Sequence, residues 1–343
     1  MPAPVVVLDP CFDPADAAAM VDLCRRFGRY RTYAELEPLE TDIGEGLAPR
    51  QDALANFLRT GGLAQEQEPP ASLAVRTSYF REEYAYGREE RIDGIGRFLY
   101  HEPFVDAARA IHGRPIVEPA IAYANLMLPG QELAVHTDVP EFRGANRKLI
   151  PQWLLVVMHH SGLFDEYRMP IATAIVWPCG MNEGGGALAY WPEGPDRPMR
   201  EHRLRPDTAI VLDTDSVFHG VERIGDVATA DLPRFRRGTT LDAVEDGAWA
   251  VHASDGTEVG RYAWEQLRFS VSWKAYCFRD EHERDTWRDH RDDLTLDFIL
   301  DRLIDDLGTR GVVSRDAERD GALGQLLIDE YIRFPDEPSD SLR

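Results

Sequence analysis

The chain has 343 residues, of which 43% are hydrophobic and 29% charged, so it has enough apolar material for a compact globular fold and does not have the composition of a disordered chain. Its formal charge of −22, from 60 Asp and Glu against 38 Lys and Arg, disfavours nucleic acid and anionic membrane surfaces as partners. The four cysteines form no CxxC pair, and no stretch approaches the roughly 20 apolar residues of a membrane helix, so we expect a cytoplasmic protein without a disulfide framework or a thiolate zinc site.

Residues 1–115 are predicted to form a mostly helical flank. A short strand at 4–8 comes first, and the pair Asp13–Pro14 then supplies an N-cap and a helix-starting proline for an amphipathic run. A second apolar stripe at helical spacing occupies 97–112 and stops at a glycine. Helices are therefore expected before the core begins.

From residue 116 the sequence changes to short runs rich in β-branched and aromatic residues, separated by turn residues such as Pro129–Gly130. This pattern is typical of an all-β sandwich or barrel. A Pro-initiated apolar stretch at 151–167 predicts a helix inserted into it, and the charged, periodic tail predicts helices again. The expected organisation is a helical flank at 1–115, a β core at 116–280 with inserts at about 141–170 and 225–265, and a helical flank at 281–343.

His136 and Asp138 form a His-x-Asp triplet on a predicted strand that returns from the Pro129–Gly130 turn. Side chains alternate along a strand, so both ligands lie on one face and can converge on a single ion. A second triplet of this kind, at 290–292, lies in the charged tail and is interpreted as solvated helix surface. A hydrogen-bonded structural histidine is the simpler alternative for His136.

His219 is the candidate third ligand, because it follows an apolar run and a polar turn and so begins a strand expected near the first. Two imidazoles and one carboxylate hold Fe(II) at three positions and leave the others open for a co-substrate and dioxygen. His202 and His252 compete with His219 but are expected to be exposed. The pair His159–His160 falls in the predicted helix and is expected to serve packing or surface.

These residues resemble the Fe(II)- and 2-oxoglutarate-dependent dioxygenase superfamily, whose core is a double-stranded β-helix, or jelly roll, of the cupin-like kind. The resemblance covers roughly residues 116–278 and is carried by four segments: the strand, turn and strand at 123–138, the glycine-rich strand at 184–190, the histidine at 219, and the strand at 267–274. It implies Fe(II) bound by His136, Asp138 and His219, and a reaction that consumes 2-oxoglutarate and releases succinate and CO2, usually with hydroxylation of a substrate.

The resemblance also implies where 2-oxoglutarate binds. Arg268 and Ser270 look like the family's Arg-x-Ser pair, and strand alternation places them on one face. A guanidinium fork matches the far carboxylate of 2-oxoglutarate, and a serine hydroxyl can add a hydrogen bond. Asn125, on the strand before the His-x-Asp triplet, is a further candidate contact. An ordinary ion pair at a strand edge is the alternative for Arg268.

The spacing between His219 and Arg268 departs from the family pattern. Arg268 follows His219 at a much greater distance in sequence than the family's basic residue usually does. An insertion at about 225–265, with a β-hairpin turn expected at Asp255–Gly256, accounts for the spacing and is a candidate lid over the substrate. Arg223, only four residues after His219, is the rival anchor.

The substrate is expected to be a small molecule, an amino acid or a peptide, and three basic residues after the triplet could meet an acidic group on it: Arg143, Arg147 and Lys148. Two other classes stay open. A cupin-like metalloenzyme that does not use 2-oxoglutarate would not need Arg268. A non-catalytic jelly-roll binding module would bind its ligand without iron.

Overall fold

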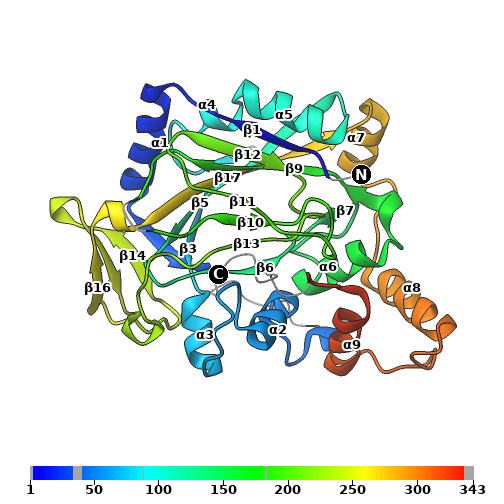
Figure 1. Cartoon of the computed structure of the whole chain (residues 1–343). Helices are drawn as coiled ribbons and strands as arrows, with labels where there is room; N and C mark the ends of the chain where they lie inside the picture. The colour runs from blue at the N-terminus through cyan, green and yellow to red at the C-terminus, as the bar shows by residue number, and fades with distance from the viewer. Residues whose placement is uncertain (1–2, 34–40, 88, 182–183, 336–343) are drawn as a thin grey trace.

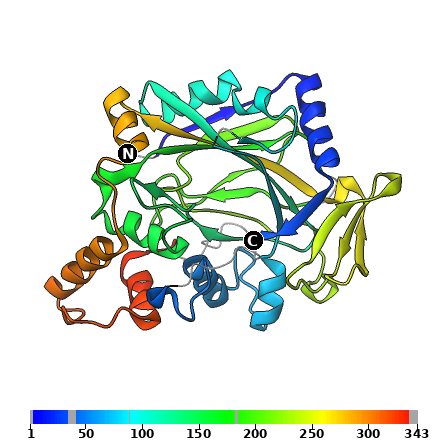
Figure 2. The same cartoon turned by 180° about the vertical axis from the view of Figure 1, so that it is seen from behind.

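The computed structural model describes residues 3–33, 41–87, 89–181 and 184–335. Its centre is built from two antiparallel sheets that lie between layers of helices (Figures 1 and 2). The large sheet runs in the order β1 (Val5–Leu8), β12 (Thr208–Leu212), β9 (Ile171–Trp177), β17 (Arg268–Phe278), β5 (Ile116–Met127), β3 (Phe80–Tyr86), β2 (Arg29–Thr32), β14 (Thr240–Ala243), β15 (Trp249–His252) and β16 (Glu258–Tyr262), with β4 (Glu89–Glu90) beside β3.

The small sheet runs in the order β11 (Arg200–His202), β10 (Leu188–Tyr190), β13 (His219–Val221) and β6 (Leu133–His136). A separate pair joins β7 (Glu141–Phe142) to β8 (Arg168–Met169). Residues of both sheets line one pocket between them, as expected for two facing layers. The predicted jelly-roll core with flanking helices is therefore confirmed.

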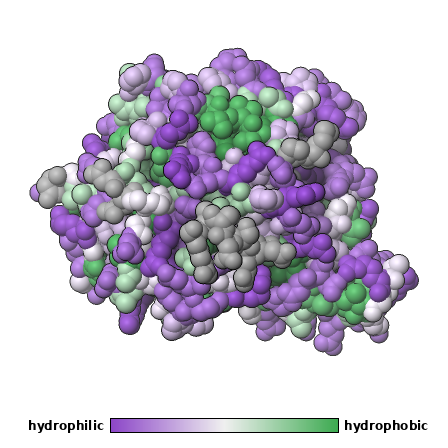
Figure 3. Space-filling view, in the orientation of Figure 1, coloured by the Kyte–Doolittle hydropathy of each residue, from purple (hydrophilic) through white to green (hydrophobic). Residues whose placement is uncertain are grey.

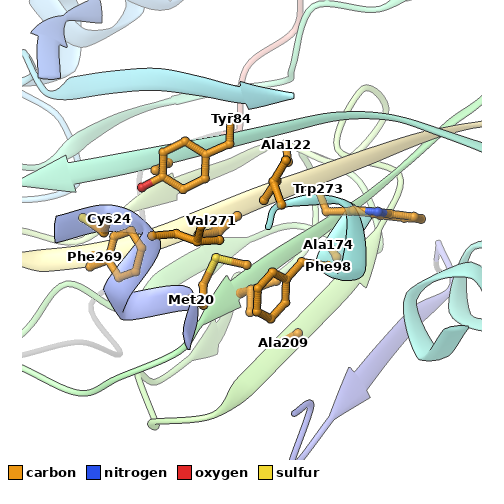
Figure 4. Packing of buried hydrophobic residues seen from close by; sticks show 14 of the residues in the cluster. Met20, Cys24, Tyr84, Phe98, Ala122, Ala174, Ala209, Phe269, Val271 and Trp273 are labelled. Atoms are coloured by element: carbon orange, nitrogen blue, oxygen red, sulfur yellow. The ribbon is translucent and has the colours of Figure 1, made fainter. Parts of the chain in front are cut away.

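Three helices cover the outer face of the large sheet (Figure 1): α1 (Pro14–Phe27), α4 (Gly96–Leu99) and α5 (Glu102–His112). The first begins as predicted, because the Asp13 carboxylate accepts a hydrogen bond from the Asp16 amide at 2.8 Å and Pro14 opens the helix. Met20 of α1 and Phe98 of α4 pack with Trp273 of β17 in the main core (Figure 4). This packing fixes one face of β17 and turns its other face inward.

Helix α7 (Glu281–Arg288) packs against the end of β17 in the large sheet. The other helices lie around the small sheet and the end of the chain: α2 (Gln51–Thr60), α3 (Pro70–Arg76), α6 (Gln152–Ser161), α8 (Leu296–Thr309) and α9 (Gly321–Tyr331). Short 3-10 turns are η2 (Asp42–Gly44), η3 (Asp165–Tyr167), η4 (Thr229–Asp231), η5 (Glu245–Gly247) and η6 (Trp264–Gln266). The stretch predicted as a helix at 151–167 contains α6, whose residues from Trp153 to Met158 are buried in a second apolar core with α8 and α9.

The surface facing the viewer in Figure 3 is mostly hydrophilic, with scattered apolar patches. Among the described residues, no helix has both the length and the apolar character that crossing a bilayer requires.

The first 115 residues are less helical than the sequence pattern predicted. Strands β1, β2 and β3 all join the large sheet, and β3 pairs directly with β5. The run Arg81–Glu83 places consecutive charged residues within β3. These charges are accommodated because this end of the sheet faces cavities, whereas Phe80 and Tyr84 on the same strand are fully buried.

The insertion at 225–265 contains the predicted hairpin but does not form the predicted lid. Strands β15 and β16 pair around Asp255–Gly256, where Gly256 has a φ of 85°. Strand β14 pairs with β2, so the insertion lengthens the large sheet at its edge (Figure 1). None of its residues lines the cavities described below.

Candidate active site

The two histidines of the predicted triad lie directly opposite each other across the β6–β13 pair. His136 is the last residue of β6 and His219 the first of β13, and their ring centroids are 4.4 Å apart. Asp138 follows just beyond the end of β6, with Oδ1 3.5 Å from Nε2 of His136 and 3.8 Å from Nε2 of His219. One atom from each side chain lies within 4.8 Å of the others, so a single ion can contact all three.

The backbone holds both imidazoles in the tautomer that a metal needs. Nδ1 of His136 lies 2.7 Å from the Ala134 carbonyl oxygen, and Nδ1 of His219 lies 2.9 Å from that of Val217. A carbonyl oxygen only accepts, so each Nδ1 carries the proton and each Nε2 keeps its lone pair for an ion. Burial, reinforced by the neighbouring His136, lowers the pKa of His219 to about 3, so His219 is neutral at physiological pH.

The carboxylate of Asp138 is oriented through its second oxygen. Oδ2 accepts hydrogen bonds from the Lys274 ammonium and from the Thr214 hydroxyl, both at 2.7 Å. Burial raises the pKa of Asp138, but Lys274 and the two imidazoles outweigh burial, and the pKa lies well below its usual value. Asp138 is therefore ionised at neutral pH, with Oδ1 directed toward the imidazoles.

A narrow cavity of about 50 Å³ leads from the triad into the space between the sheets and reaches Arg268. The Arg268 side chain is buried, with Nε donating to the Gly186 carbonyl at 2.9 Å and one terminal nitrogen donating to the Ser270 hydroxyl at 3.3 Å. The other terminal nitrogen has no hydrogen-bond partner, and no carboxylate among the described residues forms an ion pair with Arg268. Burial lowers the pKa of this guanidinium, and an anion in the cavity would offset that cost.

Two further predicted residues also line this cavity. Ser270 lies beside Arg268 on β17, and Asn125 stands opposite Ser270 in the β17–β5 register. The Asn125 amide donates to the Ser272 hydroxyl at 3.3 Å, and its oxygen accepts from Nε of Arg81 at 2.8 Å. The alternation predicted for this strand is confirmed, since its apolar residues point into the core beneath the helices.

Gly186 allows the chain to pass close to Arg268. Its φ of 71° lies in the left-handed region, and a Cβ built there would lie 3.0 Å from Cε of Met181 and 3.3 Å from Cδ of Arg268. The glycine-rich segment that the sequence singled out therefore supplies both the carbonyl that binds Arg268 and the space that its side chain needs.

The rival anion anchor, Arg223, already has partners. It donates to the Glu66 carboxylate and to the Val227 carbonyl, and it does not line the cavity beside the triad. Arg143 is similarly bound, to Asp292 at 2.7 Å. Both guanidiniums are therefore already paired with a carboxylate, whereas the Arg268 guanidinium is not.

The competing histidines lie outside the triad. His202 was predicted to be exposed, which is wrong: it is buried and stacks on Trp177 with ring centroids 5.0 Å apart. His252 is partly buried and bonds to Asp242 at 2.7 Å, so it is not simply exposed either. His290 of the second triplet is 74% exposed, as expected.

A larger cavity of about 340 Å³ adjoins the triad, and His136 and Asp138 form part of its wall. Much of the rest comes from the N-terminal third, including Tyr33, Arg50 and Arg81, which sequence reasoning did not identify as site residues. Arg147, one of the three basic residues expected near an acidic group, also lines it.

No family model matches the sequence, and no curated protein matches it. Among solved structures, a 2OG-Fe(II) oxygenase family oxidoreductase from Burkholderia pseudomallei is similar at 12% identity and a TM-score of 0.40, covering 80% of this chain and 87% of that one. A prolyl-4-hydroxylase from Pseudomonas putida aligns at 13% identity and a TM-score of 0.37, covering 80% and 93%. HygX from Streptomyces hygroscopicus, solved with nickel, 2-oxoglutarate and hygromycin B, aligns at 9% identity and a TM-score of 0.39, covering 80% and 83%. The family that the sequence resembles is thus represented among these structures.

Proposed function

We propose that this protein is an Fe(II)- and 2-oxoglutarate-dependent oxygenase that oxidises a small molecule. The observation that carries the proposal is the placement of a three-ligand metal face beside a buried guanidinium without a counter-ion. His136, Asp138 and His219 form the face, and Arg268 is the guanidinium. Paired histidines and buried arginines each occur in proteins of many kinds, but their connection through one cavity fits a metal and a small dianion bound together.

The donor set fits Fe(II). Two neutral imidazoles and one carboxylate from one side leave the remaining coordination positions open for a co-substrate and dioxygen. The cavity of about 50 Å³ has room for several water molecules at roughly 10–15 Å³ each, and hence for a short carbon chain in their place. The Arg268 fork and the Ser270 hydroxyl would then bind the far carboxylate of 2-oxoglutarate.

When bound together, iron, 2-oxoglutarate and dioxygen supply the oxidising chemistry, with succinate and CO2 as products. The chain contributes position and shielding. Lys274 and Thr214 hold the Asp138 carboxylate, and backbone carbonyls hold the imidazoles. The cavity of about 340 Å³ would keep the substrate beside the ligands, and its size suits a small molecule.

The test is anaerobic addition of Fe(II) and then 2-oxoglutarate to the whole protein, with visible absorption as the readout. We expect the weak charge-transfer band of a 2-oxoglutarate–Fe(II) chelate, and succinate after air is admitted. Arg268→Gln should need far more 2-oxoglutarate to form the band.

The two alternatives give different results in the same experiment. A metalloenzyme that does not use 2-oxoglutarate would bind Fe(II) but form no band, and Arg268→Gln would leave its activity unchanged. A binding module would retain its ligand affinity in the His136→Ala variant.

A further inference from the structure

The larger cavity holds two cationic side chains, Arg81 and Arg147, whose nearest carboxylates, Asp138 for Arg81 and Glu141 for Arg147, act on them through space without direct contact. Among the described residues, neither guanidinium forms an ion pair. A third arginine in the same wall, Arg50, shows the usual alternative: it makes a two-pronged contact with Asp52, at 3.0 and 2.8 Å. The contrast is marked in a chain with 60 acidic residues against 38 basic ones.

Arg81 is held by aromatic rings in place of a carboxylate. Its guanidinium carbon lies 4.0 Å from the ring centroid of Tyr123, 4.4 Å from that of Tyr33 and 5.2 Å from that of Tyr79. Its Nε donates to Asn125, and its terminal nitrogens donate to no described residue. Cation–π contacts fix the plane of the group without using its hydrogen-bond donors, so the two terminal nitrogens remain available to a ligand.

Arg147 reaches the same place from the segment between β7 and α6. Its Nε is buried and has no hydrogen-bond partner in the described part of the protein. Both arginines, with Tyr33 and Tyr123, also line a neighbouring cavity of about 260 Å³, so they lie where the two cavities meet. Two like charges in one wall repel each other unless an anion lies between them.

We propose that the substrate carries an oxyanion, a carboxylate or a phosphate, and that Arg81 and Arg147 bind this group. The identification of the ligand as substrate rests on the proposed oxygenase function; the anion site itself does not. His136 and Asp138 line the same cavity, so an anion bound by the arginines would place the rest of the molecule against the metal face. That remainder is expected to be carbon-rich, because the rest of the cavity wall includes Ala53, Leu54, Pro49, Ala74 and Val139.

The test is calorimetric titration of the whole protein, without iron or 2-oxoglutarate and at constant ionic strength, with three probes of one shape. Benzoate and phenyl phosphate carry the two oxyanions, and benzamide is the neutral analogue. We expect at least one anion to bind, and benzamide to bind at least 10-fold more weakly. Arg81→Gln and Arg147→Gln should each weaken anion binding at least 10-fold, because each removes charge-assisted hydrogen bonds.

Two control variants locate the site. Arg203→Gln removes an exposed charge outside the cavity and should bind the anion as the wild type does. Arg268→Gln would lose affinity for the anionic probes only if they bound in the 2-oxoglutarate pocket. We expect it to change the affinity for these probes less than 2-fold. The proposal is overturned if no anion binds, if benzamide binds equally well, or if affinity is lost in Arg268→Gln and kept in the other two cavity variants. If Arg81→Gln fails to fold, Arg147→Gln decides alone.

This experiment and the chelate experiment fail separately. Absence of the visible band with intact anion binding would remove the oxygenase function and leave the anion site. A normal band with no effect of Arg81→Gln or Arg147→Gln on anion binding would remove the anion site and leave the oxygenase function.

Discussion

Nζ of Lys274 lies 2.7 Å from Oδ2 of Asp138, the carboxylate oxygen that does not approach the imidazoles. Lys274 is itself buried, so its charge is matched mainly by this carboxylate. The ion pair fixes the orientation of Asp138 without occupying Oδ1. A metal ligand is thus positioned by a residue that would not touch the metal.

Lys274→Met is expected to lower Fe(II) affinity 10- to 100-fold, the usual effect of losing a group that orients a ligand. The remaining contact to Oδ2 would be the Thr214 hydroxyl. Anaerobic titration with Fe(II) measures this change. The matched control is Lys148→Met, which removes an exposed lysine and should leave the affinity unchanged. Equal affinities for wild type and Lys274→Met would show that Asp138 needs no such support.

The pH dependence of metal binding should change in the same variant. Lys274 keeps the pKa of Asp138 well below its usual value, so the carboxylate stays ionised as the pH falls toward that lowered pKa. Without Lys274 the pKa of Asp138 rises, because burial is then opposed by less positive charge. The acid limit of Fe(II) binding should therefore move to higher pH in Lys274→Met. An unchanged limit would contradict the assigned cause of the shift.

Arg268→Met should affect the two states of the protein in opposite directions. The affinity for 2-oxoglutarate should fall about 10- to 100-fold, since hydrogen bonds between charged groups are worth roughly 1.5–3 kcal/mol. The ligand-free protein should gain roughly 1 kcal/mol or more of stability, because a buried, unpaired cation is replaced by an apolar chain. Binding and thermal unfolding measure the two effects. Arg223→Met is the control and should keep its affinity for 2-oxoglutarate. If Arg223→Met lost as much affinity as Arg268→Met, Arg268 could not be assigned as the residue that binds 2-oxoglutarate.

Gly186→Ala should both strain the backbone and displace the Arg268 side chain. At a φ of 71° an alanine costs about 1–3 kcal/mol, and its Cβ would press on Met181 and Arg268. Gly311→Ala shares a similar φ, 73°, but has no atom within 4 Å of the added Cβ. Both variants should lose stability in thermal unfolding, and only Gly186→Ala should lose 2-oxoglutarate affinity. Unchanged affinity in Gly186→Ala would show that the close approach does not position Arg268.

The residues predicted from the sequence are those whose position follows from strand periodicity. His136, His219 and Arg268 each stand on a strand with a clear pattern, and the structure brings them to one cavity. Lys274 was missed, although alternation from Arg268 places it on the same inward face. Its burial follows from the contacts of its ammonium with Asp138 at 2.7 Å and Asp215 at 3.8 Å, which the sequence alone does not show.

The N-terminal contribution could not be predicted in the same way. Arg81 lies on a strand where consecutive charged residues obscure the alternation of apolar and polar side chains. Its guanidinium contacts residues that are distant in sequence, such as Tyr123. The supposed lid failed for a related reason. A hairpin is visible in the sequence, but the strand that it joins does not follow from the sequence: β15 pairs with β14, and β14 pairs with β2 at the edge of the large sheet.

Fe(II) titration of the whole protein and of single alanine variants tests the central claim most directly. We expect one ion per chain in the wild type, and loss of that ion in His136→Ala, Asp138→Ala and His219→Ala. His290→Ala, from the exposed second triplet, should bind as the wild type does. If His219→Ala kept wild-type stoichiometry and affinity, the three side chains would not form one iron site, and the proposed oxygenase would be contradicted.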